Sequence, residues 1–279
     1  MRVYQELAYL IHQRPYRDHS ALVYLLTQNH GKINAVVSGL KNQKTNKRAL
    51  LQPAQPLLVD LTLKPNLSKL DHLERHYAST ARVASNLSDT RSNNYENNYK
   101  KDQSDNRSDD LAGTGIHARG SYQSPEYFMF YQYAHELLLY ILPDQLPVPV
   151  LFTQYETFLA RLAQQKTHLA LRQLELALID QFANIPDLTT TYDTQQPISA
   201  DKDYFLSHEM GVADRRPAGE CLPIHGAQLL AAQHLAHGET DETLAQGAQA
   251  VTTYLLKPLL GQKSLKTRAI FSDLKKYQS

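Results

Sequence analysis

Residues 20–38 constrain the fold most, because they hold two β-type runs separated by only a short loop. The runs cover residues 20–27 and 33–38, and the loop between them contains Gly31. Glycine tolerates the positive φ that closing a short hairpin requires. The pattern predicts an antiparallel β-hairpin near the start of the chain.

Three further β-type runs surround this hairpin, at residues 6–13, 56–63 and 67–77. Five short strands in this length fit a small closed barrel, which leaves no sheet edge exposed. Among small barrels, the five-stranded OB-fold is a frequent binder of oligonucleotides, although this step is an analogy between folds. We predict that residues 1–80 form an OB-fold nucleic-acid-binding domain.

Two predicted loops of this barrel are basic. Residues 14–19 place Arg14 and Arg17 on either side of Tyr16, and residues 39–55 contain Lys41, Lys44, Lys47 and Arg48 without an acidic residue. Residues 1–76 hold 11 Lys and Arg against 5 Asp and Glu, whereas residues 126–256 hold 6 against 16. Cationic loops with an aromatic side chain suit single-stranded nucleic acid, because phosphates are attracted and bases can stack. Ordinary solvated surface charge is the alternative.

The chain changes character after the barrel. Residues 86–124 are rich in Asn, Ser and Asp, and we expect a disordered polar insertion because they can bury little apolar surface. From residue 125 apolar side chains recur at helical spacing, and helices are predicted up to Pro143 and near residues 153–165, 167–182, 224–237, 240–256 and 263–277. Residues 125–279 are therefore predicted to form an α-helical domain, which makes the fold class α+β.

Several kinds of active site are not indicated. Cys221 is the single cysteine, which excludes an internal disulfide and a cysteine-built zinc site. Neither a GxxxxGK[ST] phosphate loop nor a GxSxG motif occurs, and His234 and His237 lack a convincing third metal ligand. No run approaches the ~20 apolar residues that span a membrane. We expect a soluble, cytoplasmic protein, and its motifs indicate no active site, cofactor or metal.

An ordered set of short motifs runs through most of the chain. In the N-terminal part these are residues 8–12 followed by 14–20, Thr27 with residues 30–32, residues 39–41, and residues 51–53 before 56–57. In the C-terminal part they are residues 136–138 before 142–143, 171–175, and 260–261 before 265–268. This set resembles the bacterial RecO family, of the type without zinc. Thr267 stands where the family usually has Ser, and the polar insertion is unusual.

The resemblance implies the fold predicted above and a role as a DNA repair and recombination mediator without covalent chemistry. RecO-like proteins bind single- and double-stranded DNA and anneal complementary strands in the RecF pathway. With RecR they help RecA replace the single-stranded DNA-binding protein SSB, which implies a cytoplasmic, nucleoid-associated location. We assign the DNA contacts to Arg14, Tyr16, Arg17, Lys32, Lys41, Lys44, Lys47 and Arg48. The rival function is an OB-fold adaptor that acts through protein contacts with little direct DNA binding.

RecO-like proteins also bind the acidic C-terminal tail of SSB on their helical domain. Such a tail requires an apolar pocket rimmed by cations. Candidate cations are Arg161, Lys166 and Arg172, with Lys266 and Arg268 as the other location. Arg172 has a second interpretation, because it could simply pair with Glu175 or Glu156. The orientation of Tyr24 also has two interpretations. Tyr24 alternates with Val23 and Leu25, so its side chain faces either the barrel core or the binding surface.

Overall fold

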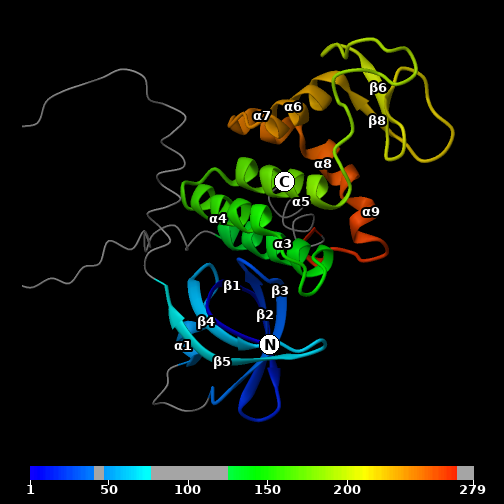
Figure 1. Ribbon diagram of the computed structural model, residues 1–279. Helices are drawn as coiled ribbons and strands as arrows, with labels where there is room; N and C mark the ends of the chain where they lie inside the picture. The colour runs from blue at the N-terminus through cyan, green and yellow to red at the C-terminus, as the bar shows by residue number, and fades with distance from the viewer. Residues whose placement is uncertain (41–46, 77–124, 269–279) are drawn as a thin grey trace, which may run out of the picture.

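Five N-terminal strands of the computed structural model close into a barrel (Figure 1). The structure describes residues 1–40, 47–76 and 125–268. The strand order is β1-β2-β3-β5-β4, in which β3 and β5 pair in parallel and the other neighbours pair antiparallel. The strands are β1 Arg2–Tyr16, β2 Ser20–Thr27, β3 Gly31–Ser38, β4 Pro56–Thr62 and β5 Ser68–Arg75. The predicted five-stranded, OB-fold-like barrel is confirmed.

Alternation along the strands separates the barrel core from its outer surface. Val23 and Leu25 of β2 are fully buried inside the barrel, together with Ile33 and Val37 of β3. Tyr24, between the two β2 core residues, is half-buried and places its ring 5.7 Å from that of His12 on the neighbouring strand. Of the two orientations open to Tyr24, the structure therefore has the outward one, as the period of two requires.

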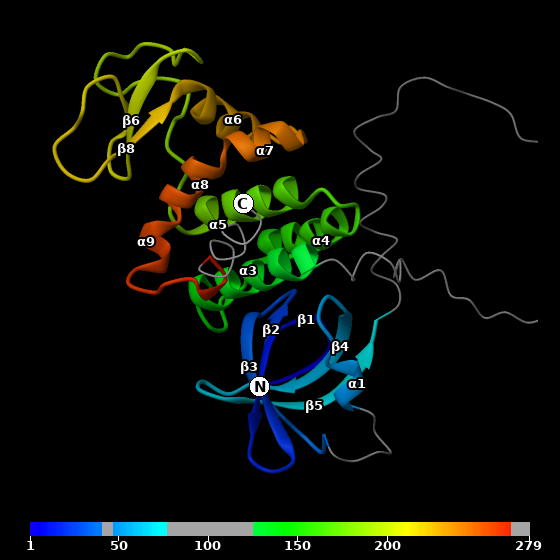
Figure 2. The ribbon, with the colours of Figure 1, turned by 180° about the vertical axis from the view of Figure 1, so that it is seen from behind.

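The C-terminal part is mainly helical and lies against one end of the barrel (Figures 1 and 2). Its helices are α3 Pro125–Ile141, α4 Pro149–Ala163, α5 Thr167–Phe182, α6 Gly226–Ala236, α7 Glu242–Gly247, α8 Gln249–Leu255 and α9 Lys257–Leu260. One short helix, α1 Lys47–Leu50, lies instead between β3 and β4. The helix predicted over residues 167–182 is confirmed with those bounds, whereas the one predicted over 240–256 is interrupted at Ala248 between α7 and α8.

A small sheet interrupts the helical part where only a loop and a helix start were predicted. Its strands are β6 Asp203–Ser207, β7 Gly211–Ala213 and β8 Leu222–His225, in the order β7-β6-β8. Residues 224 and 225 therefore belong to a strand, and α6 begins only at Gly226. Strands of three to five residues among turn residues are too short for a period-two pattern to emerge.

The barrel and the helices share an extensive contact. Tyr9 and Ile11 of β1 belong to the apolar core of the helical part, while Ala8 and Leu10 point into the barrel. The Tyr9 hydroxyl donates a hydrogen bond to Glu156 of α4 at 3.0 Å, and its ring meets that of Tyr155 edge-on. One strand therefore contributes to both cores and joins the two parts.

Two predictions fall on residues that lie outside the described part. These are the polar insertion at residues 86–124 and most of the basic segment at residues 263–277, of which only residues up to 268 are described. The domain boundaries proposed from the sequence consequently stay predictions. Within the described ranges, no helix is long and apolar enough to cross a membrane.

Candidate nucleic-acid interface

The two basic loops meet at the end of the barrel that lies away from the helices, which we call the free end. The turn between β1 and β2 and the chain leaving β3 both extend there (Figure 1). The carbonyl oxygen of His19 accepts hydrogen bonds from the backbone N–H groups of Gly39, at 3.0 Å, and Leu40, at 3.2 Å. These bonds continue the pairing of Ser20 with Ser38, so the register of the hairpin predicted from the sequence brings the loops together.

Four of the predicted DNA-contacting cations lie on these segments. Arg14, Arg17 and Arg48 are exposed, and Lys47 is half-buried with its Nζ 3.5 Å from the carbonyl oxygen of Ser38. The guanidinium carbon of Arg17 lies 5.2 Å from the ring centroid of half-buried Tyr16, a cation–π geometry. The free end therefore combines cations with one aromatic ring, and Asp18 in the same turn is the acidic exception.

The outer face of the barrel continues this surface from the hairpin. His12 pairs with Tyr24 across β1 and β2, and Arg14 pairs with Leu22 two residues further along. Partial burial, and then the positive charge of Arg14, lower the pKa of His12. His12 is consequently neutral near pH 7, where it offers a flat ring and a hydrogen-bonding edge beside Arg14 and Tyr24.

Lys32 does not belong to this surface. Its side chain is buried at the junction with the helices, where Nζ donates to the carbonyl oxygen of Leu139 at 2.9 Å and lies 3.2 Å from Asp144. Its assignment as a DNA contact is therefore corrected, because an engaged, buried ammonium cannot reach a phosphate. Lys41 and Lys44 lie outside the described residues.

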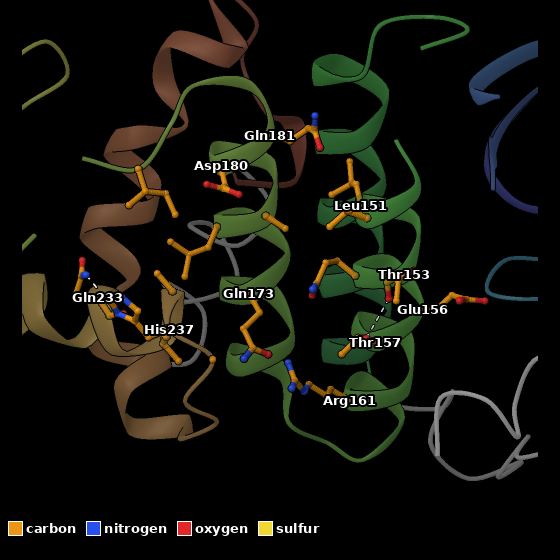
Figure 3. Close-up of a pocket in the computed structure, with 18 of the residues that line it drawn as sticks. Leu151, Thr153, Glu156, Thr157, Arg161, Gln173, Asp180, Gln181, Gln233 and His237 are labelled. Carbon is orange, nitrogen blue, oxygen red and sulfur yellow. Dashed lines mark hydrogen bonds between the residues drawn. The ribbon is translucent and has the colours of Figure 1, made fainter. Parts of the chain in front are cut away.

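A groove of about 930 Å³ crosses the helical part between α4, α5 and the end of α6 (Figure 3). Figure 3 shows Arg161 at one end of the groove beside Gln173, with Asp180 and Gln181 towards the other end. Burial lowers the pKa of Arg161, and its guanidinium forms no ion pair with any described residue. Apolar lining comes from Leu151, Leu176, Ile185 and Leu235. Among the tail-binding candidates, Arg161 alone lines this groove, and Lys166 is exposed nearby.

Arg172 is buried and already paired, so it does not line this groove. Its Nη1 lies 2.6 Å from Glu175 and 2.9 Å from the Thr252 hydroxyl on α8. The pairing of Arg172 with Glu175, one of the two interpretations of the sequence, is the one that the structure has. The assignment of Arg172 to the cationic rim of the SSB-tail site is therefore corrected.

The same buried network reaches the C-terminal candidates. Tyr133 donates from its hydroxyl to Glu175 at 2.8 Å and accepts from Arg268 Nη2 at 2.7 Å. Burial, and then the negative charge of Glu175, raise the pKa of Tyr133 far above its ordinary value. Glu136 accepts hydrogen bonds from the backbone N–H groups of Lys266, at 2.9 Å, and Thr267, at 3.0 Å. The three C-terminal motifs that carried the resemblance thus meet in space, and Arg268 is structurally engaged.

The two histidines singled out in the sequence lie on or beside α6. His234 Nδ1 pairs with Glu239, and His237 Nδ1 lies 3.0 Å from the carbonyl oxygen of Gln233. In the part of the chain that the structure describes, no three His, Cys, Asp or Glu side chains are grouped so that they could hold a metal ion.

Sequence reasoning missed one feature near the barrel, a smaller cleft between α3 and the residues that lead into β4. Tyr127 and Tyr131 belong to the apolar side chains whose spacing predicts a helix from residue 125, whereas Phe128 lies off that stripe and is exposed. The signal that could have found it was an aromatic cluster at the start of a helix, with one ring off the apolar stripe.

Comparison with known proteins places both parts of the chain in one family. A family model described as "Recombination protein O N terminal" matches residues 1–77, and one described as "Recombination protein O C terminal" matches residues 123–269. The DNA repair protein RecO of Alteromonas mediterranea is 30% identical over 268 residues, which cover 95% of each chain. The DNA repair protein RecO of Nitrosococcus oceani is 30% identical over 280 residues, which cover 99% of this chain and 96% of that protein.

Proposed function

The chain belongs to the RecO family, and we propose that it mediates DNA repair and recombination by holding DNA at the free end of its barrel. The observation that carries this proposal is the junction of the two basic loops at the His19 carbonyl. It brings the turn that carries Arg14 and Arg17 to the chain leaving β3, which continues into α1 with Lys47 and Arg48, on a barrel whose other end is covered by helices. The role is that of a mediator without covalent chemistry, and it requires no cofactor.

The proposed mechanism is mainly electrostatic. Arginine and lysine side chains neutralise phosphates and release condensed counterions, so affinity falls as salt is raised. Tyr16 adds a ring on which a base can stack. Contacts made chiefly to phosphates leave base edges available for pairing. A protein of this kind binds single and double strands alike and allows complementary strands to anneal.

The further partners follow from the family resemblance. RecR is the proposed partner with which the protein helps RecA replace SSB on single-stranded DNA. For the SSB tail, the groove with Arg161 is the favoured receptor, because it offers a desolvated cation beside apolar side chains. A carboxylate that pairs with such a guanidinium gains more than it would with a fully hydrated one.

Oligonucleotide titrations at several salt concentrations test the DNA interface. Removing one phosphate-binding side chain should flatten the logarithmic salt dependence for single strands by ~0.7, so Lys47→Ala/Arg48→Ala should flatten it by ~1.4. Arg215→Ala/Arg216→Ala is the matched control, because both of these arginines are exposed and adjacent in the helical part. An unchanged slope in the first variant would remove these residues from the interface. Salt-insensitive, negligible binding by the wild type would favour the adaptor function instead.

A fluorescent SSB-tail peptide tests the groove separately. Arg161→Ala should weaken binding of the peptide, whereas Arg215→Ala, at an exposed arginine outside the groove lining, should leave binding as in the wild type. Wild-type affinity in Arg161→Ala would move the site elsewhere, with Lys166 and Lys266 as the exposed candidates that remain.

A further inference from the structure

The smaller cleft, of about 320 Å³, lies where the barrel meets α3. One wall is the chain that enters β4, and the other consists of three aromatic side chains of the helix. Its lining residues are Gln52, Pro53, Ala54, Gln55, Tyr127, Phe128 and Tyr131. None of them is charged, and the apolar lining consists of flat rings, a proline and an alanine. Such a site fits a planar group with a polar edge better than a branched aliphatic side chain.

The floor of the cleft is held rigidly. The Tyr131 hydroxyl accepts a hydrogen bond from the backbone N–H of Ala54 at 2.9 Å and lies 3.5 Å from the carbonyl oxygen of Leu10. The Tyr131 ring also packs on that of buried His135, with centroids 3.9 Å apart. Tyr131 therefore fastens the barrel segment to α3, so the two walls of the cleft keep a fixed separation.

Two lining groups remain for a ligand. Phe128 is 56% exposed, an unusual state for a phenylalanine beside two buried tyrosines. Gln55 has a buried Oε1 that accepts no hydrogen bond from any described residue. A buried amide oxygen without a donor is costly, and Gln55 lines the cleft, so a ligand that turns this oxygen towards the cleft and supplies a donor is favoured. The cleft thus offers one ring for stacking and one acceptor for a polar edge.

The residues that form one wall of the cleft come shortly after the basic segment with Lys47 and Arg48 in the sequence. Arg48 precedes Gln52 by four residues, so their Cα atoms are at most ~14 Å apart, because an extended chain advances at most ~3.6 Å per residue. A strand whose phosphates lie on Lys47 and Arg48 can therefore bring a neighbouring base to the cleft. The positive charge beside an uncharged aromatic site matches the charge pattern of single-stranded nucleic acid.

From these observations we infer that the cleft binds one unpaired nucleobase, stacked on Phe128 with its edge towards Gln55. This inference rests on the proposed DNA binding and names the part of the ligand that the junction recognises. Bases in a duplex are stacked inside the helix and must be extracted before they enter a pocket, which costs free energy. The cleft consequently favours single strands over duplexes, whereas the phosphate contacts of the free end do not distinguish them.

The test compares an oligo-dT with an abasic oligonucleotide of the same length and phosphate number. Stacking of one base on an aromatic ring corresponds to about 5- to 150-fold in affinity. Phe128→Ala should therefore reduce the preference for oligo-dT over the abasic strand at least about fivefold, without changing the salt slope or duplex binding. A 2-aminopurine placed in the oligonucleotide should be quenched by the wild type and much less by Phe128→Ala. Gln55→Leu should also reduce the preference.

Met210→Ala is the matched control, because Met210 is 55% exposed, close to the 56% of Phe128, and lies next to the small sheet. It should leave the preference unchanged. An unchanged preference and unchanged quenching in Phe128→Ala, with salt-dependent binding retained, would overturn the base site alone. Absence of any oligo-dT binding by the wild type would overturn the proposed DNA binding and the base site with it.

Discussion

Gly31 sits where the hairpin turn of the barrel touches the chain between α3 and α4, and its replacement by alanine tests that contact. Gly31 has φ +67°, and a Cβ added there would lie 1.8 Å from the carbonyl oxygen of Leu146. Gly39 has a similar φ of +78°, but a Cβ there would meet no atom of the described residues within 4 Å. Gly31→Ala and Gly39→Ala therefore share the backbone strain and differ in the steric clash.

The magnitude follows from the bonds that surround the clash. Positive φ costs alanine ~1–2 kcal/mol at either position. At Gly31 the two chains must also separate, which breaks Gln145 N–H to the Lys32 carbonyl at 2.8 Å and Asn34 to Asp144 at 2.7 Å. The Lys32 bond to Leu139 breaks as well. Three hydrogen bonds at ~1 kcal/mol each add about 3 kcal/mol. We expect Gly31→Ala to lose roughly 4–5 kcal/mol of unfolding free energy and Gly39→Ala only ~1–2.

Urea unfolding of both variants measures these losses, and limited proteolysis near residue 146 reports on separation of the barrel from the helices. Equal losses for Gly31→Ala and Gly39→Ala would refute the reasoning, because the contact with Leu146 would then contribute nothing. Increased cleavage in Gly31→Ala alone would support it.

Two further predictions concern buried ionisable groups. Arg172→Met should cost ~3–5 kcal/mol, because it removes the ion-pair partner of the fully buried Glu175, and Arg172→Met/Glu175→Gln should recover much of this in urea unfolding. A double variant no more stable than the single one would contradict this. Burial lowers the pKa of His135 from 6.5 to about 3, so the unfolded state alone binds its proton between these values. The free energy of unfolding therefore has its full value above pH 6.5, and below that pH it falls by ~1.4 kcal/mol for each pH unit. Between pH 7 and 5 the wild type should lose about 2 kcal/mol more than His135→Gln, and parallel pH profiles would exclude this contribution.

Local signals in the sequence determined much of the architecture. The hairpin around Gly31 and the helix at residues 167–182 were predicted because a turn residue and a side-chain period act over a few neighbouring positions. The meeting of the two basic loops follows from the hairpin register, since Ser20 pairs with Ser38. The family was likewise indicated by the order of short motifs, which the comparisons confirm.

Tertiary structure alone decided which charged and aromatic side chains are available. Lys32 and Arg172 have the chemistry of surface cations, yet one is buried against α3 and the other pairs with Glu175 inside the helical part. Phe128 is exposed beside two buried tyrosines of the same helix. The strands of the small sheet, β6–β8, are too short to show a period-two pattern in the sequence. Burial depends on which surface a distant segment covers. A local sequence pattern cannot predict a contact between residues more than a hundred positions apart, such as Lys32 and Leu139.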